Sequence, residues 1–136
     1  MMNRVFNRGV GAGKGPVEYC VNAIVPKFDA ETRRRIKGEF VTRNPPPVVL
    51  FGDPKRTISL IDSVDNKWKY TSGVIAFGDQ DAPTSEEITE VIKSFEQMAF
   101  AGLDPEQYDC LWIMHTHEGN VELHYVTPRV ELSSGK

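Results

Sequence analysis

The chain has 136 residues, a length typical of a single domain with one hydrophobic core. Apolar residues make up 40% of the sequence and charged residues 26%, which are ordinary proportions for a globular protein and argue against disorder. No apolar run is long enough to span a membrane, the N-terminus lacks a signal-peptide core, and two cysteines are too few for a disulfide framework. These features predict a cytoplasmic protein that does not bind membranes.

The net charge of −3 is unevenly distributed. Residues 1–43 carry nine Lys and Arg against four Asp and Glu, a net charge of +5, whereas residues 44–136 carry seven against fifteen, a net charge of −8. A basic segment beside an acidic body is compatible with an anionic ligand held by the N-terminal part, although a solvated charged helix would have the same composition. The overall acidity argues against a non-specific nucleic-acid coat protein.

The N-terminal segment predicts a Gly-rich loop between a short strand, residues 5–6, and a helix over residues 17–24. The loop, residues 9–16, contains four glycines and ends in a proline, which suits the first turn of the helix. Its backbone amides and Lys14 could cradle a phosphate, but a flexible turn explains the composition equally well. Tyr19 would lie in the first helical turn, near the positive end of the helix dipole, although packing is the more common role for such a residue.

The middle of the chain predicts a further series of elements. They are a short exposed helix and loop over the basic residues 26–43, a stiff extended linker over 44–47, a buried strand over 48–51, a helix from Asp53 to about Asp65, and a strand over 70–77 with a bulge at 71–73. Thr84 to Glu87 matches a capping box, and apolar residues then recur at helical spacing as far as Gly102. We expect those apolar residues to form core.

All three histidines fall within residues 115–124. Apolar runs on both sides predict two strands, and Glu118-Gly119 predicts a two-residue hairpin turn between them. With this turn His115 would face Glu122, and His124, two residues further along the second strand, would point to the same side.

Two imidazoles and a carboxylate that converge in this way can hold a divalent cation and leave coordination positions free for a substrate. His117 would lie near the edge of the same site. Histidines on a hairpin also often lie on the solvated face of an edge strand, so the pattern favours a metal site without excluding that role.

The order of elements predicts an α+β fold. We expect a central, mainly antiparallel sheet with helices packed on one face, as in a two-layer sandwich. The other face of the hairpin would then be free to carry a site.

Several motifs occur together in a characteristic order. They are residues 6–9 (FNRG) leading to 13–19 (GKGPVEY), then 69–74 (KYTSGV), 100–103 (FAGL) and 121–128 (VELHYVTP). In this combination the chain resembles the plasmid mobilization relaxases, the strand-specific DNA-nicking enzymes of conjugation, within the HUH endonuclease group. The similarity is greatest to the branch found on small mobilizable colicin plasmids, and it covers nearly the whole chain apart from a region near residues 22–47.

The resemblance implies a catalytic tyrosine and a metal site. The family nucleophile falls on Tyr19, and the metal ligands fall on His115, Glu122 and His124. The family generally has histidine at all three ligand positions and the colicin-plasmid branch has His, Glu and Asn, so this chain carries an intermediate set. Many relatives have an aspartate where His117 stands, which makes His117 a candidate for an orienting or ligating group. The implied cofactor is Mg²⁺ or Mn²⁺, with Zn²⁺ as a further candidate.

The resemblance also implies a substrate and partners. Single-stranded DNA at a transfer origin would be cut with formation of a 5′-phosphotyrosine, and accessory mobilization proteins would assist. Arg4, Arg8 and Lys14 are candidates for contacts with DNA phosphates. In the related rolling-circle replication initiators the tyrosine follows the histidine motif, whereas here it precedes the motif, which favours the relaxases.

Relaxase domains of this kind usually continue beyond the strand that ends near Pro128. We therefore expect one relaxase domain over residues 1–136 that is a C-terminally truncated or minimal version. Two other functions stay open: a non-catalytic DNA-binding module related to relaxases, and a metal-dependent phosphoesterase that uses water in place of Tyr19. A covalent DNA adduct that depends on Tyr19 would distinguish the relaxase from both.

Overall fold

The computed structural model of the chain describes the backbone of residues 2–132 and the side chains of residues 9–132. The elements in chain order are β1 (Met2–Gly9), α1 (Lys14–Val21), β2 (Ile24–Phe28), β3 (Arg35–Thr42), β4 (Val48–Phe51), α2 (Pro54–Asp62), β5 (Tyr70–Ala76), α3 (Ser85–Ala99), the 3₁₀ turn η1 (Pro105–Gln107), β6 (Leu111–His115) and β7 (Glu122–Pro128). This arrangement confirms the predicted α+β class.

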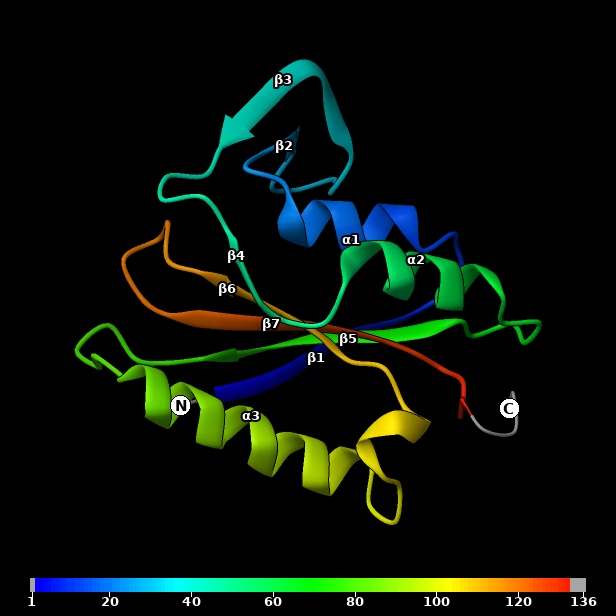
Figure 1. Cartoon of the computed structure of the whole chain (residues 1–136). Coiled ribbons are helices and arrows are strands. Elements are labelled where there is room, and N and C mark those ends of the chain that lie inside the picture. The colour runs from blue at the N-terminus through cyan, green and yellow to red at the C-terminus, as the bar shows by residue number, and fades with distance from the viewer. Residues whose placement is uncertain (1, 133–136) are drawn as a thin grey trace.

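The main sheet has five strands in the order β1-β5-β7-β6-β4, and every neighbouring pair is antiparallel. The predicted mainly antiparallel sheet is therefore confirmed. β2 and β3 form a separate two-stranded antiparallel ribbon, which lies beyond α1 from the main sheet (Figure 1).

The ribbon replaces the exposed helix and loop predicted over residues 26–43, so that prediction was wrong. Apolar residues pair across the two strands, with Val25 opposite Val41 and Pro26 opposite Phe40. The connection between the strands is closed by the Asp29 carboxylate, which accepts hydrogen bonds from backbone N–H groups of the turn. These cross-strand contacts join residues that lie far apart in sequence, and the polar composition of the segment did not reveal them.

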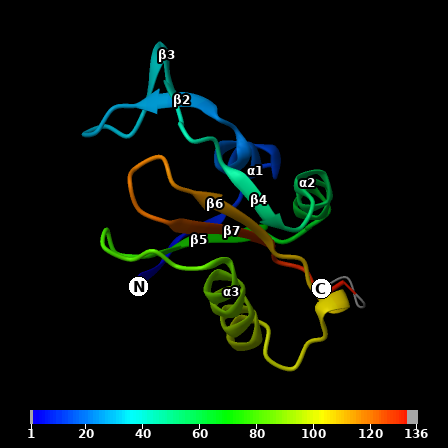
Figure 2. The same cartoon turned by 60° about the vertical axis from the view of Figure 1, so that its left-hand side comes forward.

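Helices cover both faces of the main sheet, whereas the sequence predicted helices on one face. α1 and α2 lie on one side and α3 lies on the other, as both views show (Figures 1 and 2). The physical reason is visible in β6, where Leu111, Trp112 and Ile113 are consecutive and all fully buried. A strand with apolar residues on both faces needs a layer on each side.

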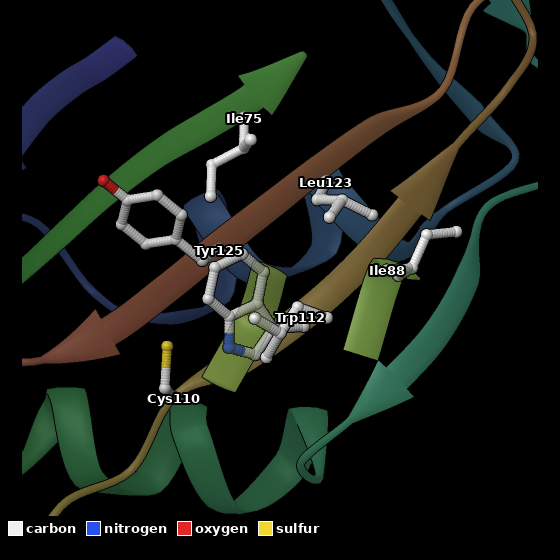
Figure 3. Packing of buried hydrophobic residues seen from close by; sticks show 7 residues of the cluster. Ile75, Ile88, Cys110, Trp112, Leu123 and Tyr125 are labelled. Atoms are coloured by element: carbon white, nitrogen blue, oxygen red, sulfur yellow. The ribbon is translucent and has the colours of Figure 1, made fainter. Parts of the chain in front are cut away.

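The α3 side of the sheet holds the larger aromatic core. Trp112 and Tyr125 pack there with Ile75, Leu123 and other buried residues (Figure 3). The indole N–H of Trp112 donates to one oxygen of Glu96 at 2.7 Å, and the hydroxyl of Tyr108 donates to the other oxygen at 2.7 Å. This carboxylate therefore ties α3 to the sheet and to the segment before β6.

On the opposite side, α1 and α2 pack closely at Gly13. The N–H of Gly13 donates to the Asp62 carboxylate at 2.8 Å, and a Cβ added at Gly13 would lie 2.9 Å from the carbonyl oxygen of Ile58. At the start of the same loop, Gly9 lies against the ring of Tyr70, which a Cβ would overlap. Packing thus accounts for two of the four glycines in the Gly-rich loop.

Of the other local predictions, the two helix caps are confirmed and the position of the bulge was wrong. The capping box of Thr84 and Glu87 at the start of α3 is confirmed, and so is the Asp53 cap of α2, although α2 ends at Asp62. The bulge lies in β1, between Val5 and Asn7, and not in β5.

β4 was predicted to be buried but is an exposed edge strand, with Val48, Val49 and Phe51 each 40–47% exposed. An apolar run of four residues does not reveal whether a strand lies inside a sheet or at its edge. Among the residues that the structure describes, no helix has the length and apolar character needed to cross a membrane.

Candidate active site

The hairpin of β6 and β7 has the predicted register. Its pairs run from Leu111 opposite Val126 to His115 opposite Glu122. The connection is six residues long, 116–121, and not the predicted two. It contains a turn in which the N–H of Gly119, at a φ of +89°, donates to the carbonyl of Thr116 at 3.3 Å. Both loops share the same centre, so the register survives the error in loop length.

The register brings the three predicted metal ligands together. One potential ligand atom from each of His115, Glu122 and His124 lies within 4.8 Å of the others. The rings of His115 and His124 are stacked with centroids 4.0 Å apart, and Nε2 of His124 lies 3.1 Å from Oε1 of Glu122. Two imidazole nitrogens and a carboxylate oxygen form a donor set suited to a divalent cation.

A backbone contact with α1 orients His115. Its Nε2 lies 2.7 Å from the carbonyl oxygen of Cys20. A carbonyl oxygen can only accept, so Nε2 of the neutral ring must carry the hydrogen and donate it. The lone pair is then on Nδ1, which is the nitrogen left available to a cation.

Both histidines of the cluster are neutral at neutral pH. Burial lowers the pKa of His115 to about 4, with further lowering by His124 and Arg43. Burial likewise lowers the pKa of His124 to about 4, and the nearby charges of Arg43 and His117 lower it further. A metal binds the neutral imidazole, and in that form one nitrogen of each ring carries no proton and can act as a ligand.

Tyr19 lies on α1, next to the residue that orients His115. The helix begins at Lys14, three residues before the predicted start, so Tyr19 is in its second turn and not near its N-terminus. The prediction that Tyr19 lies in the first turn, near the positive end of the helix dipole, was therefore wrong. The side chain is 43% exposed, and its ring makes an edge contact with Phe28 at 5.8 Å between centroids.

One cavity of about 640 Å³ joins the tyrosine to the histidine cluster. It lies between the main sheet and α1 on one side and the β2–β3 ribbon on the other, and the ribbon contributes residues from both of its strands. The residues that line it include Tyr19, Arg43, Tyr70, His115, Glu122 and His124.

The other predicted site residues lie outside the cluster of His115, Glu122 and His124, or their side chains lie outside the described part of the structure. His117 lines the cavity, 5.5 Å from His115 between ring centroids, and its buried Nδ1 has no hydrogen-bond partner among the described residues. It lies outside the three-residue cluster. Lys14 is exposed at the start of α1 and does not line the cavity. Arg4 and Arg8 belong to β1, where side chains lie outside the described part of the structure, so their DNA contacts stay predictions.

Sequence reasoning missed Arg43. It assigned this residue to an exposed basic segment, yet the side chain is only 6% exposed. Nη1 donates to the carbonyl oxygens of Tyr19 and Asn22, and Cζ lies 4.7 Å from the centroid of the Tyr19 ring. No local pattern could have identified it, because its burial depends on the ribbon folding back over α1.

Two curated proteins match the chain along all 136 residues. The chain is 39% identical to the cryptic plasmid protein C of Neisseria gonorrhoeae and 35% identical to the DNA relaxase MbeA of Escherichia coli. It spans 58% of the length of the first protein and 23% of the second. No family model matches the chain, and no solved structure matches it significantly.

These matches include a protein named as a DNA relaxase, and they extend over every motif on which the resemblance rested. They support the resemblance seen in the sequence: along its whole length this chain is similar to a plasmid protein and to a protein named as a DNA relaxase.

Proposed function

We propose that this chain is the nicking domain of a plasmid mobilization relaxase. Tyr19 would cut single-stranded DNA at a transfer origin with the help of a divalent cation held by His115, Glu122 and His124. The observation that carries this proposal is that the tyrosine and all three ligands line one cavity. Similarity over the whole chain to a protein named as a DNA relaxase supports it. Accessory mobilization proteins are further partners under this proposal.

The reaction is a transesterification. The phenol oxygen of Tyr19 attacks phosphorus and loses its proton, the bond from phosphorus to the 3′ oxygen breaks, and the 3′ oxygen takes up a proton. The products are a 5′-phosphotyrosine and a free 3′-hydroxyl, and the reverse reaction rejoins the strand. A free tyrosine has a pKa near 10, so the site has to favour deprotonation in the attack.

Other residues of this chain would hold the cation and orient its ligands. The three-residue cluster would hold the cation, and when bound the cation would neutralise charge on the non-bridging phosphate oxygens. The carbonyl of Cys20 keeps His115 in the tautomer that offers Nδ1. Imidazole suits Zn²⁺ and carboxylate suits Mg²⁺ or Mn²⁺, so the mixed donor set accommodates all three candidates.

The test is the formation of a covalent adduct. Labelled single-stranded oligonucleotides that tile a transfer origin are incubated with the protein and Mn²⁺, and the products are separated on denaturing gels. We expect a DNA–protein adduct that disappears on chelation and in Tyr19→Phe and His124→Ala, but persists in the control Lys93→Gln, which changes an exposed charge on α3 outside the cavity.

Two results would contradict the proposal. Cleavage that survives in Tyr19→Phe without an adduct would identify a phosphoesterase that uses water. If the protein binds the oligonucleotides tightly but does not cleave them in the presence of Mg²⁺, Mn²⁺ or Zn²⁺, it is a non-catalytic DNA-binding module.

A further inference from the structure

A buried cation lies beside Tyr19, and the reaction described above does not use it. Arg43 follows directly after β3, and its Nη1 donates to the carbonyl of Tyr19 and, at 3.2 Å, to that of Asn22. The guanidinium lies over the Tyr19 ring, with Cζ 4.7 Å from the centroid. These contacts fix the guanidinium where α1 meets the ribbon, and the side chain lines the cavity.

The charge of Arg43 lacks a partner in the described part of the protein. No carboxylate of the described residues forms an ion pair with it, and Glu122 is hydrogen-bonded to the neutral ring of His124. Burial of an unpaired guanidinium is costly, and two carbonyl oxygens with an aromatic face compensate for it only in part. The buried positive charge of Arg43 therefore favours the binding of an anion in the cavity.

The donors of Arg43 are also only partly used. A guanidinium has five N–H donors in a planar fork, and the hydrogen bonds of Arg43 to the described residues all come from Nη1. Nε and Nη2 form none with these residues. A planar fork with free N–H groups matches the oxygens of a phosphate group.

We propose that Arg43 binds a non-bridging oxygen of the phosphodiester that Tyr19 attacks. This inference rests on the proposed function and adds a second source of positive charge at the scissile phosphate, supplied by the protein itself. The same side chain holds Tyr19 through the backbone carbonyl and the ring, so it sets the position of the nucleophile relative to that phosphate. Fixed positive charge aimed at the transferring phosphoryl group stabilises its transition state.

Salt dependence of binding tests this proposal without any catalysis. Fluorescein-labelled single-stranded oligonucleotide is titrated with protein in the presence of chelator, and anisotropy is followed at several NaCl concentrations. For single strands, each phosphate contact contributes about −0.7 to the slope of log K against log salt. We expect the slope to become shallower by about 0.7 in Arg43→Gln and to stay unchanged in Arg43→Lys. Lys93→Gln, an exposed charge on α3, is the matched control and keeps the slope.

Three outcomes separate the possibilities. A wild-type slope in Arg43→Gln would overturn the proposal. Equal losses in Arg43→Gln and Arg43→Lys, which differ in charge, would also overturn it and assign Arg43 a purely structural role. A wild-type protein that does not bind the oligonucleotide would overturn the proposed function itself, and this inference with it.

Two further measurements protect the test against a variant that does not fold. In wild-type protein, the Nε–H resonance of Arg43 in ¹⁵N spectra, assigned by comparison with Arg43→Lys, is expected to shift when oligonucleotide is added with chelator present. The absence of a shift would overturn the proposal. With Mn²⁺, adduct formation by a folded Arg43→Gln is expected to slow by about 10²–10³-fold, the usual cost of one donor to a developing oxyanion.

Discussion

The Cys20 carbonyl links the orientation of His115 to the position of Tyr19. It accepts the Nε2 hydrogen of His115 at 2.7 Å, and it belongs to the residue that follows Tyr19 on α1. A shift of this helix would therefore move the proposed nucleophile, Tyr19, and release the proposed ligand His115 together. This coupling resembles the outer hydrogen bonds that orient histidine ligands in metal sites generally.

The depressed histidine pKa values predict how stability depends on pH. The pKa of His115 and of His124 is about 4 in the folded protein, against an ordinary value of 6.5. The unfolded chain thus binds more protons between these values. The free energy of unfolding of the metal-free protein is expected to be highest above about pH 6.5 and to fall as the pH drops toward 4.

Urea denaturation of the metal-free protein at pH 7 and pH 5 checks this expectation. Carboxylates also titrate in the acidic range, so the useful quantity is the difference between the wild type and the double variant His115→Asn with His124→Asn. The variant is expected to lose less stability on acidification. Identical losses in the two proteins would show that the histidines are not buried in their neutral form.

At the scale of the elements, the contact between α1 and α2 depends on Gly13. A Cβ at this position would lie 2.9 Å from the carbonyl oxygen of Ile58 and 2.9 Å from the Cβ of Ile61. Gly13→Ala is expected to lower the free energy of unfolding by about 1–3 kcal/mol, because the helices would have to separate.

Gly15→Ala is the matched control for this prediction. Gly15 lies in the first turn of α1, and apart from its two neighbours in the chain no described residue lies within 4 Å of a Cβ added there. The higher helix propensity of alanine is opposed by the ring of Pro16, which disfavours a helical conformation for a preceding residue that carries a Cβ, so this variant is expected to change the free energy of unfolding by less than about 1 kcal/mol. Both values come from urea denaturation at neutral pH, and equal stability of the two variants would rule out close packing at Gly13.

Elements defined by local signals could be predicted from the sequence. The capping box of α3, the Asp53 cap of α2 and the register of His115 with Glu122 depend on residues a few positions apart. The β2–β3 ribbon could not be predicted in this way, because cross-strand pairs such as Val25 with Val41 join residues far apart in a polar and basic segment. The exposed edge position of β4 likewise depends on which strands pair with it.

At the scale of the whole molecule, the cavity is assembled from distant parts of the chain. The hairpin supplies the cluster from within ten residues, so this half of the candidate site could be predicted from spacing. The other half requires α1 and the ribbon to converge on the hairpin, which places Tyr19 and Arg43 on the same cavity. Sequence reasoning identified Tyr19 only through the family resemblance and did not identify Arg43.

Two further tyrosines line the same cavity as Tyr19, and they offer a direct test of which phenol attacks the DNA. Tyr125 is almost fully buried, and burial raises its pKa. Tyr70 lines the same cavity as Tyr19, but burial, and then the neighbouring Cys20, raise the pKa of Tyr70. A phenol that resists deprotonation is the poorer nucleophile. The proposed mechanism therefore assigns the attack to the exposed Tyr19 alone.

The decisive measurement is to map the adduct by mass spectrometry after digestion with nuclease and trypsin. The proposed mechanism predicts a nucleotide remnant, linked through its 5′-phosphate, on the peptide of residues 15–27, which contains Tyr19 and no other tyrosine. A remnant on a peptide that contains Tyr70 or Tyr125 would contradict the assignment of the nucleophile. Cleaved DNA with no modified tyrosine would contradict the transesterification mechanism altogether.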